Sequence, residues 1–126
     1  MRQTNNFLQV CKQLEALTAQ DPGLKGDVTK LREVMGVLQH HDAVSGTAKQ
    51  HVTFDYAQRL AEGINECDQV VASGLKYLMK NNPPKIEFCH LLNTTQCSAT
   101  EDNEKFVVNV YNPLGTFRIL FNFLLI

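Results

Sequence analysis

The sequence predicts a mainly α protein, a three-helix bundle followed by a short β segment. In three successive stretches of the 126 residues, apolar side chains recur every three or four positions, which is typical of amphipathic helices. Two prolines, Pro83 and Pro84, then interrupt this pattern, and residues 105–111 form a β-rich run. The length fits one domain or a piece of a larger protein. We therefore expect a helical domain at residues 1–82 and a linker, a loop and one strand at residues 83–126.

The first helix is predicted from Phe7 to Leu17. Its apolar residues follow an i, i+3, i+4, i+7 stripe, and polar side chains occupy the other faces. The sequence Asp21-Pro22-Gly23 is typical of a turn and ends the helical pattern. The stripe consists of Phe7, Val10, Cys11, Leu14 and Leu17.

The second predicted helix begins near Asp27 or Thr29, because either side-chain oxygen can cap the first backbone N–H groups. Its apolar stripe runs through Leu31, Val34 and Met35 and ends at Leu38. The helix is therefore expected to deliver three polar residues at its C-terminal end, namely His40, His41 and Asp42.

The third predicted helix is the longest and runs from about residue 48 to residue 80. Residues 81–84, Asn-Asn-Pro-Pro, end it because proline lacks the helical N–H donor and disfavours helix in the residue before it. The apolar positions are spaced by three or four residues, at Val52, Tyr56, Leu60, Ile64, Cys67, Val71, Leu75 and Leu78.

After the prolines, the run Lys105 to Tyr111 is predicted to be a strand that ends in the turn sequence Asn-Pro-Leu-Gly. A single strand cannot satisfy its own backbone donors and acceptors, so its partner must come from another segment or another chain. The apolar stretch Ile119 to Ile126 is too short to span a bilayer.

Charge and composition exclude some classes of partner. Twelve Lys and Arg against thirteen Asp and Glu give a net charge of −1 without any block of like charge. Nothing in this distribution attracts nucleic acid or an anionic membrane. The residues after Met1 show no apolar run followed by a small-residue cleavage site, so no signal peptide is predicted.

The four cysteines, at positions 11, 67, 89 and 97, allow three connectivities and lack the paired C-x-x-C spacing of structural zinc sites. Cys11 and Cys67 lie on the apolar stripes of the first and third helices, so packing of these helices would bring them together. A bridge there would stabilise the fold by ~4 kcal/mol. The alternative is a pair of buried free thiols in a reducing cell. Between Cys89 and Cys97 lies an N-glycosylation acceptor at Asn93.

The polar cluster at residues 40–42 admits two interpretations. Adjacent residues on a helix diverge by about 100°, so at most one of His40 and His41 is expected to be a good metal ligand. The simpler interpretation is a helix C-terminus at which histidine complements the helix dipole. His51 and Asp55, four residues apart on the third helix, form a second possible pair, but solvated polar residues explain them as well.

A longer motif helps to decide between a metal site and a simple helix C-terminus at residues 40–42. Residues 39–47, QHHDAVSGT, resemble the signature of the middle domain of the class II α-mannosidases, glycoside hydrolase family 38. The resemblance continues in AKQHV at 48–52 and DYA at 55–57, upstream in CKQLEAL at 11–17, and downstream in VYNPLG at 110–115. It therefore covers nearly all of residues 7–115, in order.

The resemblance implies that this chain contributes two residues to a zinc-dependent sugar site. The second histidine of the motif, His41, matches a ligand of the family's catalytic zinc, and Asp42 matches a residue that contacts hydroxyls of the bound mannose. His40 is assigned to local support. The resemblance also implies a lysosomal or secretory location, a glycan on Asn93, and the disulfides Cys11–Cys67 and Cys89–Cys97.

The family's reaction is the retaining hydrolysis of terminal α-linked mannose from glycoprotein N-glycans, in which one carboxylate attacks and another transfers a proton. The family's nucleophile, acid/base and remaining zinc ligands belong to a larger N-terminal α/β domain, which has no counterpart in this sequence. From Thr116 onward the sequence also departs from the family pattern. We therefore expect a fragment that is inactive without the missing N-terminal α/β and C-terminal β domains.

Two alternatives remain open from the sequence. The chain is either a non-catalytic helical interaction module or a self-contained zinc hydrolase that uses His41, His51 and Asp55. The absence of a recognisable nucleophile segment favours the first of these alternatives, and the helical spacing of His51 and Asp55 motivates the second.

Overall fold

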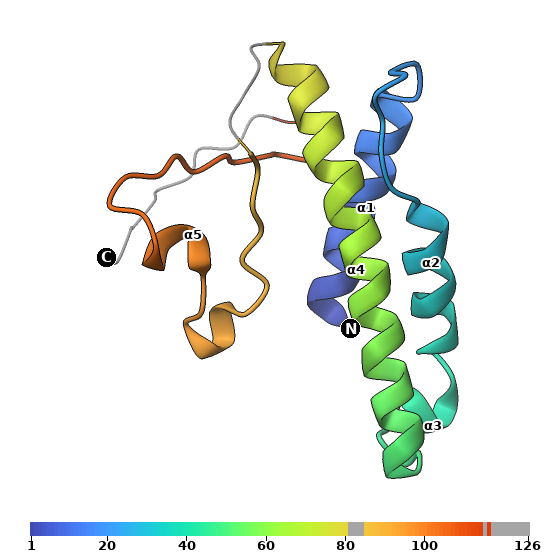
Figure 1. The fold of residues 1–126 in the computed structure, drawn as a ribbon. Helices are drawn as coiled ribbons and strands as arrows, with labels where there is room; N and C mark the ends of the chain where they lie inside the picture. The colour runs from blue at the N-terminus through green and yellow to red at the C-terminus, as the bar shows by residue number, and fades with distance from the viewer. Residues whose placement is uncertain (81–84, 115, 117–126) are drawn as a thin grey trace.

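The computed structural model describes residues 1–80, 85–114 and 116. Three helices form the bundle: α1 (Arg2–Leu17), α2 (Val28–Val37) and α4 (Gln50–Met79), with the short α3 (His41–Val44) between the last two (Figure 1). Both α1 and α2 pack against the long α4 and also contact each other. The three predicted helices and the mainly α fold class are confirmed.

The core of the bundle contains part of the predicted apolar stripes together with Leu8, Val28 and Val70, which the stripes did not include, whereas Leu17 and Leu78 of the stripes are exposed. The N-terminus of α2 is capped as expected, because the Asp27 carboxylate accepts a hydrogen bond from the Thr29 N–H at 2.7 Å. Helices α2 and α4 approach closely at Gly63, where an added Cβ would lie 3.0 Å from the Leu31 Cα. The buried apolar residues are Leu8, Cys11, Leu14, Val28, Leu31, Met35, Leu38, Cys67, Val70 and Val71.

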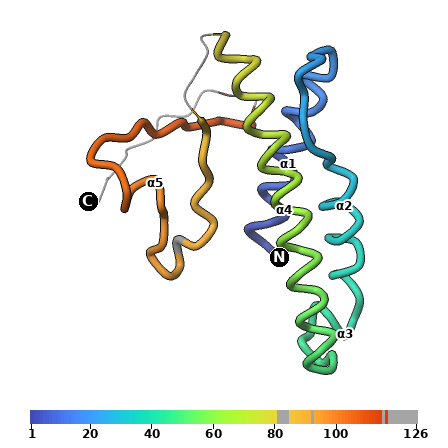
Figure 2. Tube along the Cα trace, in the orientation of Figure 1, coloured from blue at the N-terminus to red at the C-terminus, as the bar shows by residue number. Residues whose placement is uncertain are grey.

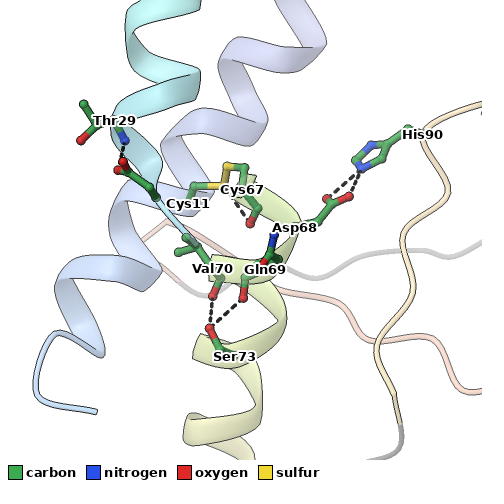
Figure 3. Close-up of a disulfide and its surroundings, with 9 residues drawn as sticks. Cys11, Thr29, Cys67, Asp68, Gln69, Val70, Ser73 and His90 are labelled. Atoms are coloured by element: carbon green, nitrogen blue, oxygen red, sulfur yellow. Dashed lines mark hydrogen bonds and ion pairs between the residues drawn. A yellow bond between two sulfur atoms is a disulfide. The ribbon is translucent and has the colours of Figure 1, made fainter. Parts of the chain in front are cut away.

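Two disulfides connect the chain, with the pairing that the family resemblance implies. Cys11 on α1 is bonded to Cys67 on α4, and both residues are fully buried between the two helices (Figure 3). Cys89 is bonded to Cys97 in the segment that follows α4. The described part of the chain holds no free cysteine, so the alternative of buried thiols is wrong.

The segment after α4 lies on the side of α4 away from α2, as the tube in Figure 2 shows. It contains the 3₁₀ helix η1 (Leu92–Thr94) and the short helix α5 (Ser98–Glu101). Its aromatic residues contact the bundle, because the Phe7 ring lies 6.0 Å from Phe88 and 5.3 Å from the His90 ring, measured between centroids. The His90 Nε2 also lies 2.8 Å from an Asp68 carboxylate oxygen.

The predicted strand at residues 105–111 is wrong for the structure of this chain. These residues have no regular secondary structure, and the one β contact in the described residues is an isolated antiparallel bridge between Leu91 and Gln96. No described segment supplies a second strand, so the backbone of residues 105–111 has no ladder to join. The run instead returns to the bundle, where the Tyr111 hydroxyl lies 3.5 Å from the Gln13 side chain.

Some expectations fall outside the described residues. These are the Asn-Asn-Pro-Pro sequence at 81–84 and the apolar stretch from Ile119 to Ile126. Among the helices that the structure describes, none is long and apolar enough to cross a membrane.

Candidate metal centre

The polar cluster lies at the end of the bundle where the chain passes from α2 to α4 (Figure 1). The expectation that α2 carries the cluster at its C-terminus is wrong, because α2 ends at Val37. Gly36, a poor helix former, stands in the last turn, and Leu38, the residue that follows the helix, is itself buried in the core. Two i to i−3 bonds, Gln39 N–H to Gly36 and His40 N–H to Val37, then tighten the chain into a turn.

This turn changes the relative directions of the two histidines. His40 is the N-cap of α3 and has an extended backbone, with φ −53° and ψ 139°, while His41 is the first residue of that helix. The argument that neighbouring side chains diverge by the helical angle therefore does not apply here. The two rings lie side by side, with centroids 4.2 Å apart and planes tilted by 47°.

Both histidines face the same carboxylate. The Nε2 atoms of His40 and His41 lie 3.4 Å and 3.6 Å from Oδ2 of Asp42. One possible ligand atom from each of the three residues falls within 4.8 Å of the others, the one such group of three in the described residues. The geometric premise that a single histidine points toward a common ligand is therefore wrong.

Asp42 is held in place by the Ser-Gly-Thr sequence that follows it. The Thr47 hydroxyl donates to Oδ1 of Asp42 at 2.9 Å, and the Thr47 and Ala48 N–H groups both donate to its backbone carbonyl at 3.1 Å. The Ser45 hydroxyl donates to the His41 carbonyl and lies 2.9 Å from the Thr47 hydroxyl. These bonds leave Oδ2 directed at the histidines.

Sequence reasoning missed Ser45 and Thr47 as parts of the site. Hydroxyl residues just after an aspartate are a known signal for local bonds from side chain to backbone, and that signal was present in the motif. Their role here is to fix the turn that presents His41 and Asp42.

The cluster is open to solvent. The side chains of His40, His41 and Asp42 are 47%, 84% and 48% exposed. A ligand or another protein surface can therefore approach the three residues from outside the bundle. Acting alone, the exposed groups lack the dry environment in which catalytic electrostatics become strong.

The donor set fits a zinc ion. Imidazole nitrogen and carboxylate oxygen are ordinary zinc ligands, and a catalytic zinc typically has three protein ligands and one open position. This chain offers at most the three clustered side chains, all on one exposed turn. The three residues therefore suit an ion whose remaining ligands come from outside the bundle.

The second predicted pair does not join this centre. Asp55 forms an ion pair with Arg59 of the same helix, at 2.7 Å, and His51 belongs to no group of metal ligands among the described residues. The structure therefore does not bring His41, His51 and Asp55 together as a self-contained zinc site.

Another titratable pair lies away from the cluster. The His90 side chain is 35% exposed and bonds to Asp68 on α4 (Figure 3). Partial burial raises the pKa of Asp68, while the hydrogen bond from His90 acts in the opposite direction. This pair attaches the segment after α4 to the bundle.

The sequence comparisons decide the family. Residues 1–78 match the family model described as the alpha mannosidase middle domain. The chain belongs to the alpha-mannosidase family. It is 48% identical over 118 residues to a lysosomal alpha-mannosidase from Bos taurus and 46% identical over 118 residues to that from Homo sapiens. It is also 47% identical over 100 residues to an alpha-mannosidase from Canavalia ensiformis.

The matches cover most of this chain but little of its relatives. The two lysosomal alpha-mannosidases align with 90% of this chain and with 12% of their own length, and the Canavalia ensiformis protein with 70% and 10%. The region that matches the family model contains α1, α2, all of α4 except Met79, and the residues of the candidate metal centre. Residues 1–78 thus correspond to the alpha mannosidase middle domain.

Proposed function

We propose that this chain supplies one part of the active site of a zinc-dependent retaining α-mannosidase. In this proposal His41 is a ligand of the zinc ion and Asp42 binds hydroxyl groups of the mannose. The observation that carries it is the convergence of His40, His41 and Asp42 within 4.8 Å, on the turn that bears the family motif.

The geometry suggests a separate role for each of the three residues. His41 is the most exposed, so its imidazole is free to reach an ion that other domains also hold. One oxygen of Asp42 is occupied by the Thr47 hydroxyl, which leaves the other to accept a hydrogen bond from a sugar hydroxyl. The His40 ring packs beside His41 and restricts its orientation. When bound, zinc would coordinate sugar hydroxyls and help to hold the ring in the orientation that the reaction needs.

Retaining hydrolysis also needs a nucleophilic carboxylate and a separate acid/base carboxylate about 5 Å apart. Three of the four acids on α4 are engaged in other contacts, since Asp55 pairs with Arg59, Glu62 with Lys30, and Asp68 with His90. We therefore assign the bond-breaking groups to other domains of the larger protein. The isolated chain is proposed to be inactive for this reason.

Substrate and location follow from the same family relationship. The proposed substrate is terminal α-linked mannose on glycoprotein N-glycans, and the proposed location is the lysosome or another part of the secretory pathway. The two disulfides suit an oxidising compartment. Asn93 is exposed within the loop that Cys89 and Cys97 close, so it is accessible for the proposed glycosylation.

A second candidate function is that of a non-catalytic interaction module. The observation that favours it is the exposed apolar run after α5, in which Phe106, Val107 and Val110 are 51%, 80% and 62% exposed. Such a run is suited to pairing with another chain or domain. The two functions are compatible if the run joins this domain to the rest of a mannosidase.

Zinc titration of the purified chain by calorimetry tests the first proposal. We expect weak, saturable binding that is lost in the His41→Ala variant and kept in the His51→Ala variant, which removes a histidine from outside the cluster. Equal binding by both variants would contradict the assignment. In parallel, a chromogenic α-mannoside with added zinc should show no turnover by the chain, and zinc-dependent hydrolysis would overturn the proposed inactivity.

A further inference from the structure

An open cavity lies at the opposite end of α4 from the metal centre. It has a volume of about 880 Å³ and lies between the turn after α1, the C-terminal half of α4 and residues 85–86. Four lysines line it, Lys25, Lys76, Lys80 and Lys85, against a single carboxylate, that of Asp21. The cavity therefore carries an excess of positive charge in a chain whose net charge is −1.

Two carboxylates offset part of this positive charge. Asp21 uses its carboxylate to accept the Gly23 N–H at 2.8 Å, and Lys85 pairs with Glu87 at 2.9 Å. The other three lysines form no ion pair within the described part of the chain. The neighbouring sequence at 81–84, Asn-Asn-Pro-Pro, carries no charge.

The helix dipole explains only part of this arrangement. Lys76 and Lys80 stand at the C-terminal end of α4, where positive charge complements the unpaired carbonyl groups. Lys25 and Lys85 come from two other segments, and the dipole of α4 gives no reason for them to face the same cavity. A shared anionic ligand does give such a reason.

One wall of the cavity, the turn after α1, is held against α4 by the fold itself. The Ser73 hydroxyl accepts the Lys25 N–H at 3.1 Å and donates to the Gln69 carbonyl at 2.7 Å, and Figure 3 shows this hydroxyl against α4. Gly26 has φ +89°, and an added Cβ would lie 2.4 Å from the Glu66 carbonyl oxygen. This close approach and the Ser73 bonds hold the turn that carries Lys25 against α4.

We propose that this cavity binds an organic phosphate. Lysine ammonium groups bind phosphate as point charges, and several of them together can surround its oxygens. The organic part of the ligand lies against the apolar lining, which Ala72, Tyr77 and Ile86 provide. The volume lies within the range of small-molecule sites, roughly 300–1,000 Å³. This site is independent of the proposed mannosidase function.

Calorimetric titration of the full chain with phenyl phosphate at low salt tests the proposal. The double variant Lys25→Gln/Lys76→Gln should bind at least about tenfold more weakly, which corresponds to ~1.4 kcal/mol. The matched control Lys12→Gln/Lys105→Gln removes the same charge from exposed positions outside the cavity and should bind within about twofold of the unmodified chain. No saturable binding, or equal loss in both double variants, would overturn the site.

A second titration tests whether the ligand is organic. Inorganic phosphate should bind to the same site more weakly than phenyl phosphate, because it makes no contact with Tyr77 and the apolar lining. The Tyr77→Leu variant should reduce this difference while leaving inorganic phosphate binding unchanged. Equal affinity for both ions in the unmodified chain would contradict the organic part of the proposal. Far-ultraviolet circular dichroism of each variant, unchanged from the original chain, shows that the helices are retained.

Discussion

The Cys11–Cys67 disulfide should provide a large share of the stability of the bundle. It joins α1 to α4 across a sequence separation of 56 residues, at the centre of the core. In the chain-entropy description, closing a loop of that length destabilises the unfolded chain by about 4 kcal/mol. Total stabilities of domains are only about 5–15 kcal/mol. The Cys11→Ala/Cys67→Ala variant should therefore be close to unfolding.

The second disulfide is a matched control for this prediction. Cys89 and Cys97 are separated by 8 residues, so the same description gives a contribution of about 2.5 kcal/mol. Urea unfolding measures the free energy of unfolding of both double alanine variants. Circular dichroism at ~222 nm, the α-helical band, follows the loss of helix. A loss below about 1 kcal/mol for the Cys11 and Cys67 pair, or equal losses for the two pairs, would refute the reasoning.

Three further predictions concern other parts of the molecule. The Gly63→Ala variant should lose about 1–3 kcal/mol of unfolding free energy, because the added Cβ would lie 3.0 Å from the Leu31 Cα. The Gly36→Ala variant has open space around the added Cβ and should gain up to ~1 kcal/mol, as measured by urea unfolding. A reversed order of the two would contradict the packing argument. The Thr47→Val variant should lose about 1 kcal/mol of unfolding free energy because it breaks the hydrogen bond to Asp42, whereas Thr47→Ser should keep most of that stability. Equal losses by both variants would exclude that hydrogen bond as the cause. Burial raises the pKa of Asp68 in the folded chain, so the folded chain binds this proton more tightly than the unfolded chain does. The free energy of unfolding, compared with that of the Asp68→Asn variant, should therefore fall as the pH rises from 3.8 and level off above the folded pKa. Urea unfolding between about pH 3.5 and 7 measures this slope, and a rise with pH would be the wrong sign.

The helices were predictable because their pattern is local. The apolar stripes of α1, α2 and α4 follow directly from residue spacing, and the Asp27 cap follows from its position before the second stripe. The end of α2 was not predictable in the same way. The stripe continues to Leu38, but Gly36 and two i to i−3 bonds stop the helix before the histidines.

That early end of α2 explains what the sequence could and could not show about the candidate site. The motif identified His41 and Asp42 as the residues of interest, and the structure places them together. The common direction of His40 and His41 depends on one extended backbone residue between two helices, which spacing alone does not reveal. The predicted strand at 105–111 failed for a related reason, since composition records a preference for strand but not the presence of a partner.

Ring-nitrogen NMR of the four histidines during zinc titration tests the proposed metal centre in the turn between α2 and α4. We expect the ring nitrogens of His41 to shift most, those of His40 to respond as its neighbour, and those of His51 and His90 to stay unchanged. The Asp42→Asn variant should weaken the response because it removes the carboxylate that faces both rings. A zinc response at His51 or His90 equal to that at His41, or no response at His41, would contradict the proposal.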